Sequence, residues 1–160
     1  MGFGFFSNLV NKNKKQRAAE VLTKSNIKVN LEPVDKYEAI KMAGRLLVEG
    51  EYVNEDYIEA MIQREDDLST YIGNGIAIPH GVGRAKEFIK KSGIVVLQFP
   101  KGIDFGDEKA YLVIGIAGVG DEHLDILSNI ATIMGEDEEK INILKDTKDI
   151  DFIHRVFTEF

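Results

Sequence analysis

Two apolar runs, GIVVLQF at residues 93–99 and AYLVIGIAGV at residues 110–119, decide the fold of this chain. Both are almost uninterrupted and rich in β-branched residues, which is typical of strands that are covered on both faces. The segment between them, PKGIDFGDEK, contains a proline, two glycines and several charges and predicts a connecting loop. We therefore expect two buried strands at the centre of a sheet.

Helical periodicity occurs on both sides of these runs in the sequence. A helix is predicted from about 35 to 49, ending at Gly50, and Asn54 is predicted to cap a second helix. A third is predicted from Glu122 to Gly135, and EDEEKINILKDT and DIDFIHRVFTEF predict two more short helices. Helices on both sides of a central apolar sheet predict an α/β fold, a three-layer α/β/α domain.

The composition is that of one soluble globular domain. The chain has 160 residues, 44% hydrophobic and 29% charged, enough to bury one core. It contains no cysteine, which excludes disulfides, thiolate zinc sites, iron–sulfur clusters and a cysteine nucleophile. The net charge of −7 argues against a nucleic-acid partner, because contacts to phosphates need a basic face. The longest apolar run, residues 110–119, is about half the length of a membrane-spanning helix.

Residues 1–17, MGFGFFSNLVNKNKKQR, are expected to form a separate leader, and the folded domain is expected to occupy residues 18–160. Residues 1–20 have a net charge of +3, which leaves −10 on the rest of the chain. The apolar part precedes the basic part, the reverse of a secretory signal peptide. We favour a flexible leader or an arm that packs on the domain. The alternative is that its phenylalanines insert into an anionic membrane surface.

The first candidate for chemistry is His80, in the stretch GNGIAIPHGVG at residues 73–83. Pro79 favours an extended conformation for Ile78, so IAIP is interpreted as the end of a strand and His80 as the first residue beyond it. Gly81 and Gly83 would leave room around the imidazole, and Gly73 and Gly75 would allow a tight approach before it, which favours an accessible side chain. The alternative is a structural histidine that caps or fills a turn.

The second candidate is His123, where an apolar strand passes through two glycines into the start of a helix. Helix N-termini favour anions because their free N–H groups and the helix dipole attract negative charge. The alternative is that Asp121 and Glu122 cap this helix and that His123 is an ordinary residue of its first turn.

Arg64 is the third candidate, because a planar guanidinium can hold two oxygens of a phosphoryl group at once. The alternative is a surface arginine paired with Asp66 or Asp67. His154 lies off the apolar face of its helix and is interpreted as solvated. The histidines lack HxH and HExxH spacing, and no GxSxG or GxxxxGK[ST] motif is present, so neither a metal site nor a bound nucleotide is expected.

The segment EDDLSTYIGNGIAIPHG, residues 65–81, resembles the phosphorylation-site signature of the mannitol/fructose-type EIIA components of the bacterial phosphoenolpyruvate-dependent sugar phosphotransferase system (PTS). The resemblance continues through LVEGEYVNEDYIEAMIQRE, SGIVVLQFPKGIDFG and LVIGIAGVGDEHLDILSNIATIM, and so covers roughly residues 22–158. PHGVGRAKE and GDEHL are closer to the mannitol branch than to the fructose branch. The resemblance implies a three-layer domain around a mixed sheet and a phosphotransferase reaction.

The resemblance also implies a role for each candidate residue. His80 matches the histidine that accepts a phosphoryl group on Nε2 from the phosphohistidine of HPr and passes it to a cysteine of an EIIB domain. His123 matches the family's second active-site histidine, and Arg64 matches the arginine of the RE pair. Both would stabilise the phosphoryl group. No cofactor and no metal are implied.

The partners implied by the resemblance are HPr as donor and the EIIB domain of a mannitol-type permease as acceptor. The protein would be cytoplasmic, with at most a peripheral membrane association through the permease. Since both partners are proteins, we expect a partly apolar docking surface around His80. The alternative function is a regulatory module of the nitrogen-related or activator-associated type, but the DEHL element and the length of the chain favour the carrier.

Overall fold

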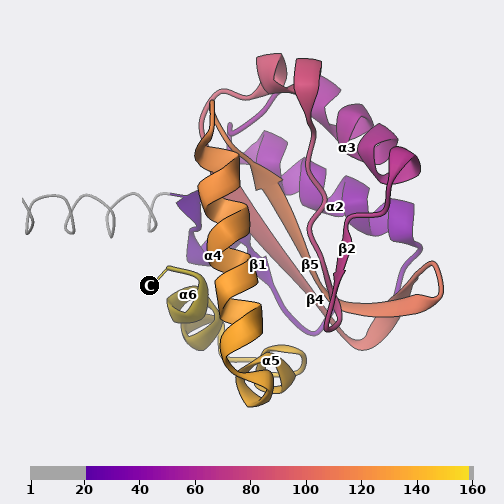
Figure 1. Ribbon diagram of the computed structural model, residues 1–160, viewed down its shortest axis with the longest axis vertical. Coiled ribbons are helices and arrows are strands. Elements are labelled where there is room, and N and C mark those ends of the chain that lie inside the picture. Colours follow the sequence, from indigo (N-terminus) through magenta and orange to yellow (C-terminus); the bar gives the residue numbers. More distant parts are fainter. Residues whose placement is uncertain (1–20, 159–160) are drawn as a thin grey trace, which may run out of the picture.

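The computed structural model describes residues 21–158 and has three layers, with a five-stranded sheet between two layers of helices (Figure 1). The leader predicted at 1–17 and the start of the predicted domain lie outside the described residues. The sheet has the order β1-β4-β5-β3-β2 and is mixed: β1 and β3 run parallel to their central neighbours, and the other two pairs are antiparallel. The strands are β1 (Ile27–Lys28), β2 (Tyr71–Gly73), β3 (Ile76–Ala77), β4 (Gly93–Phe105) and β5 (Glu108–Ala117). The predicted fold class is confirmed.

The two apolar runs do form the central strands, but the loop predicted between them is wrong. β4 and β5 continue through that segment as an antiparallel hairpin that turns tightly at Gly106, whose φ is +72°. Ile103 and Phe105 are buried while Asp104 between them is exposed, so the segment alternates with the period of a strand. A shift of register between Gln98 and Ile103 accommodates the proline and the first glycine.

Alternate residues of the central strands supply two separate cores. On one face, Val95, Leu97 and Phe99 of β4 pack with the helices α2 (Lys36–Glu49) and α3 (Asp56–Asp67). On the other, Ile94 and Val96 pack with α4 (Glu122–Glu136), α5 (Glu138–Leu144) and α6 (Ile150–Thr158). Figure 1 shows α4 in front of the sheet and α2 behind it. Both faces are therefore covered, as the uninterrupted apolar runs predict.

The predicted helix starts agree closely with the structure. The carboxylate of Asp35 accepts a hydrogen bond from the N–H of Tyr37 at 3.0 Å, and α2 begins at the next residue. The Asn54 side chain accepts from the N–H of Asp56, the first residue of α3, at 3.1 Å. The described residues also include two short 3₁₀ helices, η1 (Lys24–Asn26) before β1 and η2 (Gly83–Phe88) between β3 and β4. No helix within residues 21–158 is long and apolar enough to cross a membrane.

The prediction that His154 is solvated is wrong. Its side chain is half-buried, and Nε2 lies 2.9 Å from the carbonyl oxygen of Leu22. A carbonyl only accepts, so Nε2–H is the donor. His154 thus ties α6 to the segment before β1, a contact between residues too far apart in sequence for helical periodicity to reveal.

Candidate functional site

His80 follows β3 as predicted, but the strand ends at Ala77, two residues earlier than expected, so His80 is the third residue beyond it. The N–H of Ile116 in β5 donates to the carbonyl of Pro79 at 3.0 Å, and His80 pairs with Ile116 in an isolated parallel bridge. The chain then enters η2, at the top of Figure 1. The position of His80 is therefore determined by the central strand of the sheet.

The imidazole of His80 is more enclosed than we expected, since the residue is only 8% exposed. The glycines after it do not serve to clear space for the ring. A Cβ on Gly81 would lie 2.8 Å from the Tyr57 ring and 2.8 Å from the Cβ of Ala85, and Gly83 has a φ of +61° that suits glycine. These glycines let the loop pack against α3 and turn into η2, and the prediction of an open imidazole is wrong.

The orientation of the His80 ring follows from one hydrogen bond. Nδ1 lies 2.7 Å from the carbonyl oxygen of Ile78, and because a carbonyl only accepts, Nδ1 carries the proton. In the neutral ring the other nitrogen, Nε2, then has a free lone pair.

The surroundings of His80 favour its neutral form. Burial lowers the pKa of His80 below its ordinary value, and the positive charges of Arg64 and His123 lower it further. The hydrogen bond to Ile78 and the charge of Glu65 oppose this shift without cancelling it. The charges of Arg64 and His123 thus both act on the pKa of the His80 imidazole.

Tyr57 joins the His80 loop to the central strand. Its hydroxyl donates to the carbonyl of Ile116 at 2.7 Å and accepts from the N–H of Gly81 at 2.8 Å. Tyr57 is only 1% exposed, and burial raises its pKa to about 12, so it stays protonated and able to donate. No sequence motif singled out Tyr57, because the bridge joins residues that are 24 and 59 positions apart.

Arg64 is half-buried in the last turn of α3. Its guanidinium donates to the carbonyl of Leu68, where the helix ends. Asp66, one of the two partners considered for a surface pair, instead accepts a hydrogen bond of 2.5 Å from the hydroxyl of Tyr37. The guanidinium is thus directed toward the end of the helix.

Glu65, next to Arg64, holds the segment that leads into β2 and β3. Its carboxylate is buried and accepts from the N–H and the hydroxyl of Thr70 at 2.7 and 2.5 Å and from the hydroxyl of Ser69 at 2.8 Å. The carbonyl of Thr70 in turn accepts from the N–H of Ile78 at 3.0 Å. The acidic residue that begins the signature is therefore a positioning group for the strand end that carries His80.

His123 lies in the first turn of α4 and is half-buried. Gly118 passes so close beneath it that a Cβ there would lie 2.4 Å from the backbone nitrogen of His123. Asp121 stands at the N-cap but its side chain makes no capping hydrogen bond, and Glu122 accepts from the hydroxyl of Ser92. The side-chain cap that the alternative assigned to Asp121 is therefore absent.

Lys86 of η2 contacts both His123 and the loop before it. Its Nζ lies 3.2 Å from Nδ1 of His123 and donates to the carbonyl of Gly120 at 2.6 Å, while Nδ1 itself lies 3.1 Å from that carbonyl. No sequence motif singled out Lys86. Only the fold brings η2 against the start of α4.

Exposed hydrophobic residues accompany the three candidate residues along the chain. Four exposed hydrophobic residues, here called the apolar rim, stand within a few positions of Arg64, His80 or His123 in the sequence. They are Leu68 (68% exposed), Val82 (47%), Val119 (45%) and Leu124 (55%). A small pocket of about 200 Å³ adjoins the site and is lined by Arg64, Arg84 and Val82 among others.

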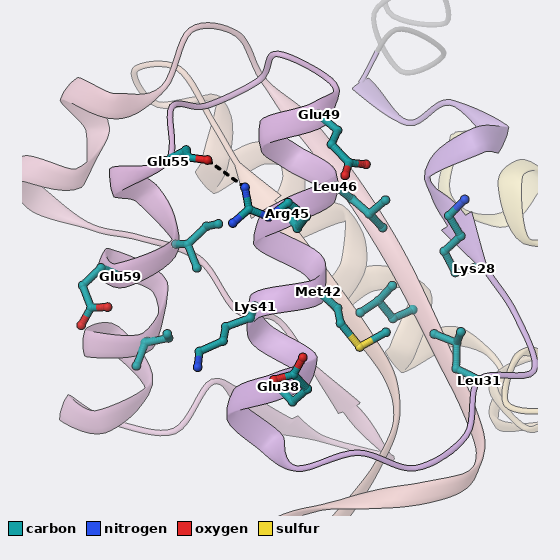
Figure 2. A pocket seen from close by; sticks show the side chains of 13 residues that line it. Lys28, Leu31, Glu38, Lys41, Met42, Arg45, Leu46, Glu49, Glu55 and Glu59 are labelled. Carbon is teal, nitrogen blue, oxygen red and sulfur yellow. Dashed lines mark hydrogen bonds and ion pairs between the residues drawn. The ribbon is translucent and has the colours of Figure 1, made fainter.

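A larger hollow of about 800 Å³ lies elsewhere, along the outer sides of α2 and α3 (Figure 2). It is lined by apolar residues such as Met42 and Leu46 and by charged residues such as Glu38, Lys41 and Arg45. None of the three candidate residues lines it. Size alone would point to this hollow, but it contains no histidine.

Comparisons with known proteins give a family-model match and similar relatives. Residues 20–160 match the family model described as phosphoenolpyruvate-dependent sugar phosphotransferase system, EIIA 2. The chain is 48% identical over 141 residues to the mannitol-specific phosphotransferase enzyme IIA component of Bacillus subtilis (strain 168), covering 88% of this chain and 98% of that protein.

Two solved structures from Escherichia coli are also similar. The complex of enzyme IIAMTL and phosphorylated enzyme IIBMTL contains a chain with a TM-score of 0.79 and 37% identity, covering 84% of this chain and 95% of that one. The crystal structure of IIA mannitol gives a TM-score of 0.76 and 38% identity, with coverage of 82% and 95%.

Proposed function

The chain belongs to the EIIA 2 family of the phosphoenolpyruvate-dependent sugar phosphotransferase system, and we propose on that premise that His80 is its phosphoryl acceptor. The observation that carries the proposal is the hydrogen bond from Nδ1 of His80 to the carbonyl of Ile78. It leaves the lone pair on Nε2, and the lowered pKa of His80 keeps the ring neutral at pH 7. A neutral imidazole with a free nitrogen attacks phosphorus without a separate base.

The transfer moves one phosphoryl group between two nitrogens. The Nε2 lone pair of His80 forms the new N–P bond while the N–P bond to the donor's imidazole breaks, and the departing electron pair stays on that donor. Transfer to the acceptor reverses the roles, as a thiolate sulfur displaces Nε2. Charge that develops on the equatorial oxygens is offset by the guanidinium of Arg64 and by a hydrogen bond from His123.

We propose HPr as the donor and an EIIB domain as the acceptor, with mannitol as the transported substrate. The identity to a mannitol-specific enzyme IIA component and the likeness to a IIAMTL chain in complex with phosphorylated IIBMTL support this assignment. The apolar rim supports a site that docks proteins, since small transient interfaces need an apolar centre.

Intact mass spectrometry tests the acceptor. The protein incubated with phosphoenolpyruvate, enzyme I and HPr is expected to gain about 80 Da in an acid-labile form. His80→Ala should show no gain, whereas His154→Ala, which changes a histidine outside the site, should gain the same mass. A wild-type protein that gains no mass would refute the proposal.

Discharge tests the acceptor partner and the substrate. Phosphorylated protein mixed with a mannitol EIIB domain should lose its phosphoryl group rapidly, and a fructose EIIB domain should be a slower acceptor. A phosphorylated protein that no EIIB domain discharges would point instead to the regulatory alternative.

A further inference from the structure

We propose that Lys86 determines which nitrogen of His123 carries the proton, and that it thereby makes the outer nitrogen, Nε2, a hydrogen-bond donor toward the phosphoryl group. The proposal rests on the function proposed above and adds a positioning residue to it. Lys86 lies in η2, directly after the loop that carries His80, and is half-buried against the start of α4.

Nδ1 of His123 has two neighbours with opposite requirements. The carbonyl of Gly120, at 3.1 Å, only accepts and would favour a proton on Nδ1. The ammonium of Lys86, at 3.2 Å, only donates and requires a lone pair on Nδ1. One nitrogen cannot meet both requirements at once.

The geometry favours the lysine. Lys86 also donates to the carbonyl of Gly120 at 2.6 Å, so that oxygen already has a donor without the imidazole. A proton on Nδ1 would in addition face the ammonium, a repulsion that grows as the surroundings are desolvated. A charge-assisted hydrogen bond from Lys86 to Nδ1 replaces the repulsion with an attraction. The proton of the neutral ring then lies on Nε2.

The consequence for chemistry is a division of roles between two imidazoles. Phosphoryl oxygens accept hydrogen bonds and are repelled by a nitrogen lone pair, so His123 can stabilise them only through an N–H. His80, in contrast, needs its Nε2 unprotonated in order to attack. The carbonyl of Ile78 leaves Nε2 of His80 unprotonated, and the ammonium of Lys86 leaves the proton of His123 on Nε2, each by occupying Nδ1.

Nitrogen-15 NMR of the histidine rings, recorded on the full, unphosphorylated chain at a pH where His123 is neutral, tests the proposal directly. In the wild type, His123 should show a protonated Nε2 and His80 a protonated Nδ1. In Lys86→Met, His123 should shift toward a protonated Nδ1, which then donates to Gly120, while His80 stays unchanged. A wild-type His123 with its proton on Nδ1, or no shift in Lys86→Met, would overturn the proposal.

Two further variants and a rate measurement complete the test. Lys86→Arg keeps a cationic donor and should retain the wild-type tautomer, and Lys90→Met, which removes an exposed lysine beyond η2, should not change it. Transfer from phospho-HPr should slow on the order of tenfold in Lys86→Met and recover in Lys86→Arg, as for a residue that acts through its neighbour. An unchanged rate despite a shifted tautomer would refute the catalytic part. A wild type that accepts no phosphoryl group would refute the proposed function while leaving the tautomer assignment standing.

Discussion

The two histidines of the site are held by different kinds of structure. His80 is only 8% exposed, and the groups that hold its loop are buried: the carbonyl of Ile78, the backbone of Ile116 and the hydroxyl of Tyr57. His123 is half-buried and is held by polar side chains at the surface, those of Lys86 and Ser92 among them. The comparison teaches that buried groups position His80, the proposed acceptor. His123, in contrast, is positioned by contacts that water can reach.

The largest effect is expected from removing the guanidinium that we propose holds the phosphoryl oxygens. Arg64→Ala should slow phosphoryl transfer by about 100-fold, since deleting one preorganised donor to the transferring group has an effect of that order. Single-turnover transfer from phospho-HPr measures it. Arg64→Lys is the matched control and should recover only part of the rate, because an ammonium cannot hold two oxygens at once. Equal rates for wild type and Arg64→Ala would remove Arg64 from the site.

The next test compares the hydroxyl of Tyr57, which holds the His80 loop, with the hydroxyl of Ser92, which holds the loop before His123. Tyr57→Phe leaves the buried N–H of Gly81 and carbonyl of Ile116 without the hydroxyl and should lower the free energy of unfolding by about 1–3 kcal/mol. Ser92→Ala removes the hydroxyl that accepts a hydrogen bond from the N–H of Val119. Because this hydrogen bond is exposed, water can replace the hydroxyl, and the loss in free energy of unfolding should be below about 1 kcal/mol. Urea unfolding measures both. A larger loss for Ser92→Ala would reverse the comparison.

The pH dependence sharpens the comparison because the pKa of His80 is lowered in the folded protein. The folded state then binds fewer protons than the unfolded state, in which the imidazole pKa is about 6.5. This contribution to stability is present above pH 6.5 and is lost as the pH falls through the lower pKa of His80. Unfolding free energies at pH 7.5 and pH 5 should differ more for the wild type than for His80→Gln. Parallel losses would mean that burial of His80 does not set its protonation.

The smallest effect is expected far from both histidines, in the large hollow of Figure 2. Arg45 pairs there with Glu55 at 2.9 Å, and both side chains are more than half exposed. Arg45→Ala should change the free energy of unfolding by at most about 1 kcal/mol and leave transfer from phospho-HPr unchanged. A slower transfer in this variant would show that partners also contact this face.

The sequence by itself determined the fold class and the place of each candidate residue along the chain. Long β-branched runs have few alternatives to buried strands, and Pro79 limits the backbone before His80 to an extended form. These are local constraints, which neighbouring residues impose on one another. Such constraints were insufficient to predict the strands in the segment 100–109. Only Ile103 and Phe105 alternate with polar residues there, and this pattern is too short to outweigh a proline and two glycines.

Only the tertiary structure decided how the site works. Each feature of the site depends on residues that are far apart in sequence. These features are the burial of His80, the bridge made by Tyr57 and the contact between Lys86 and His123. Which imidazole nitrogen carries a proton depends on the carbonyl or ammonium that happens to face it, within about 3 Å, after the chain has folded. No periodicity or motif records such a distance, because it is produced by the packing of η2 and α4 at the end of the central strand.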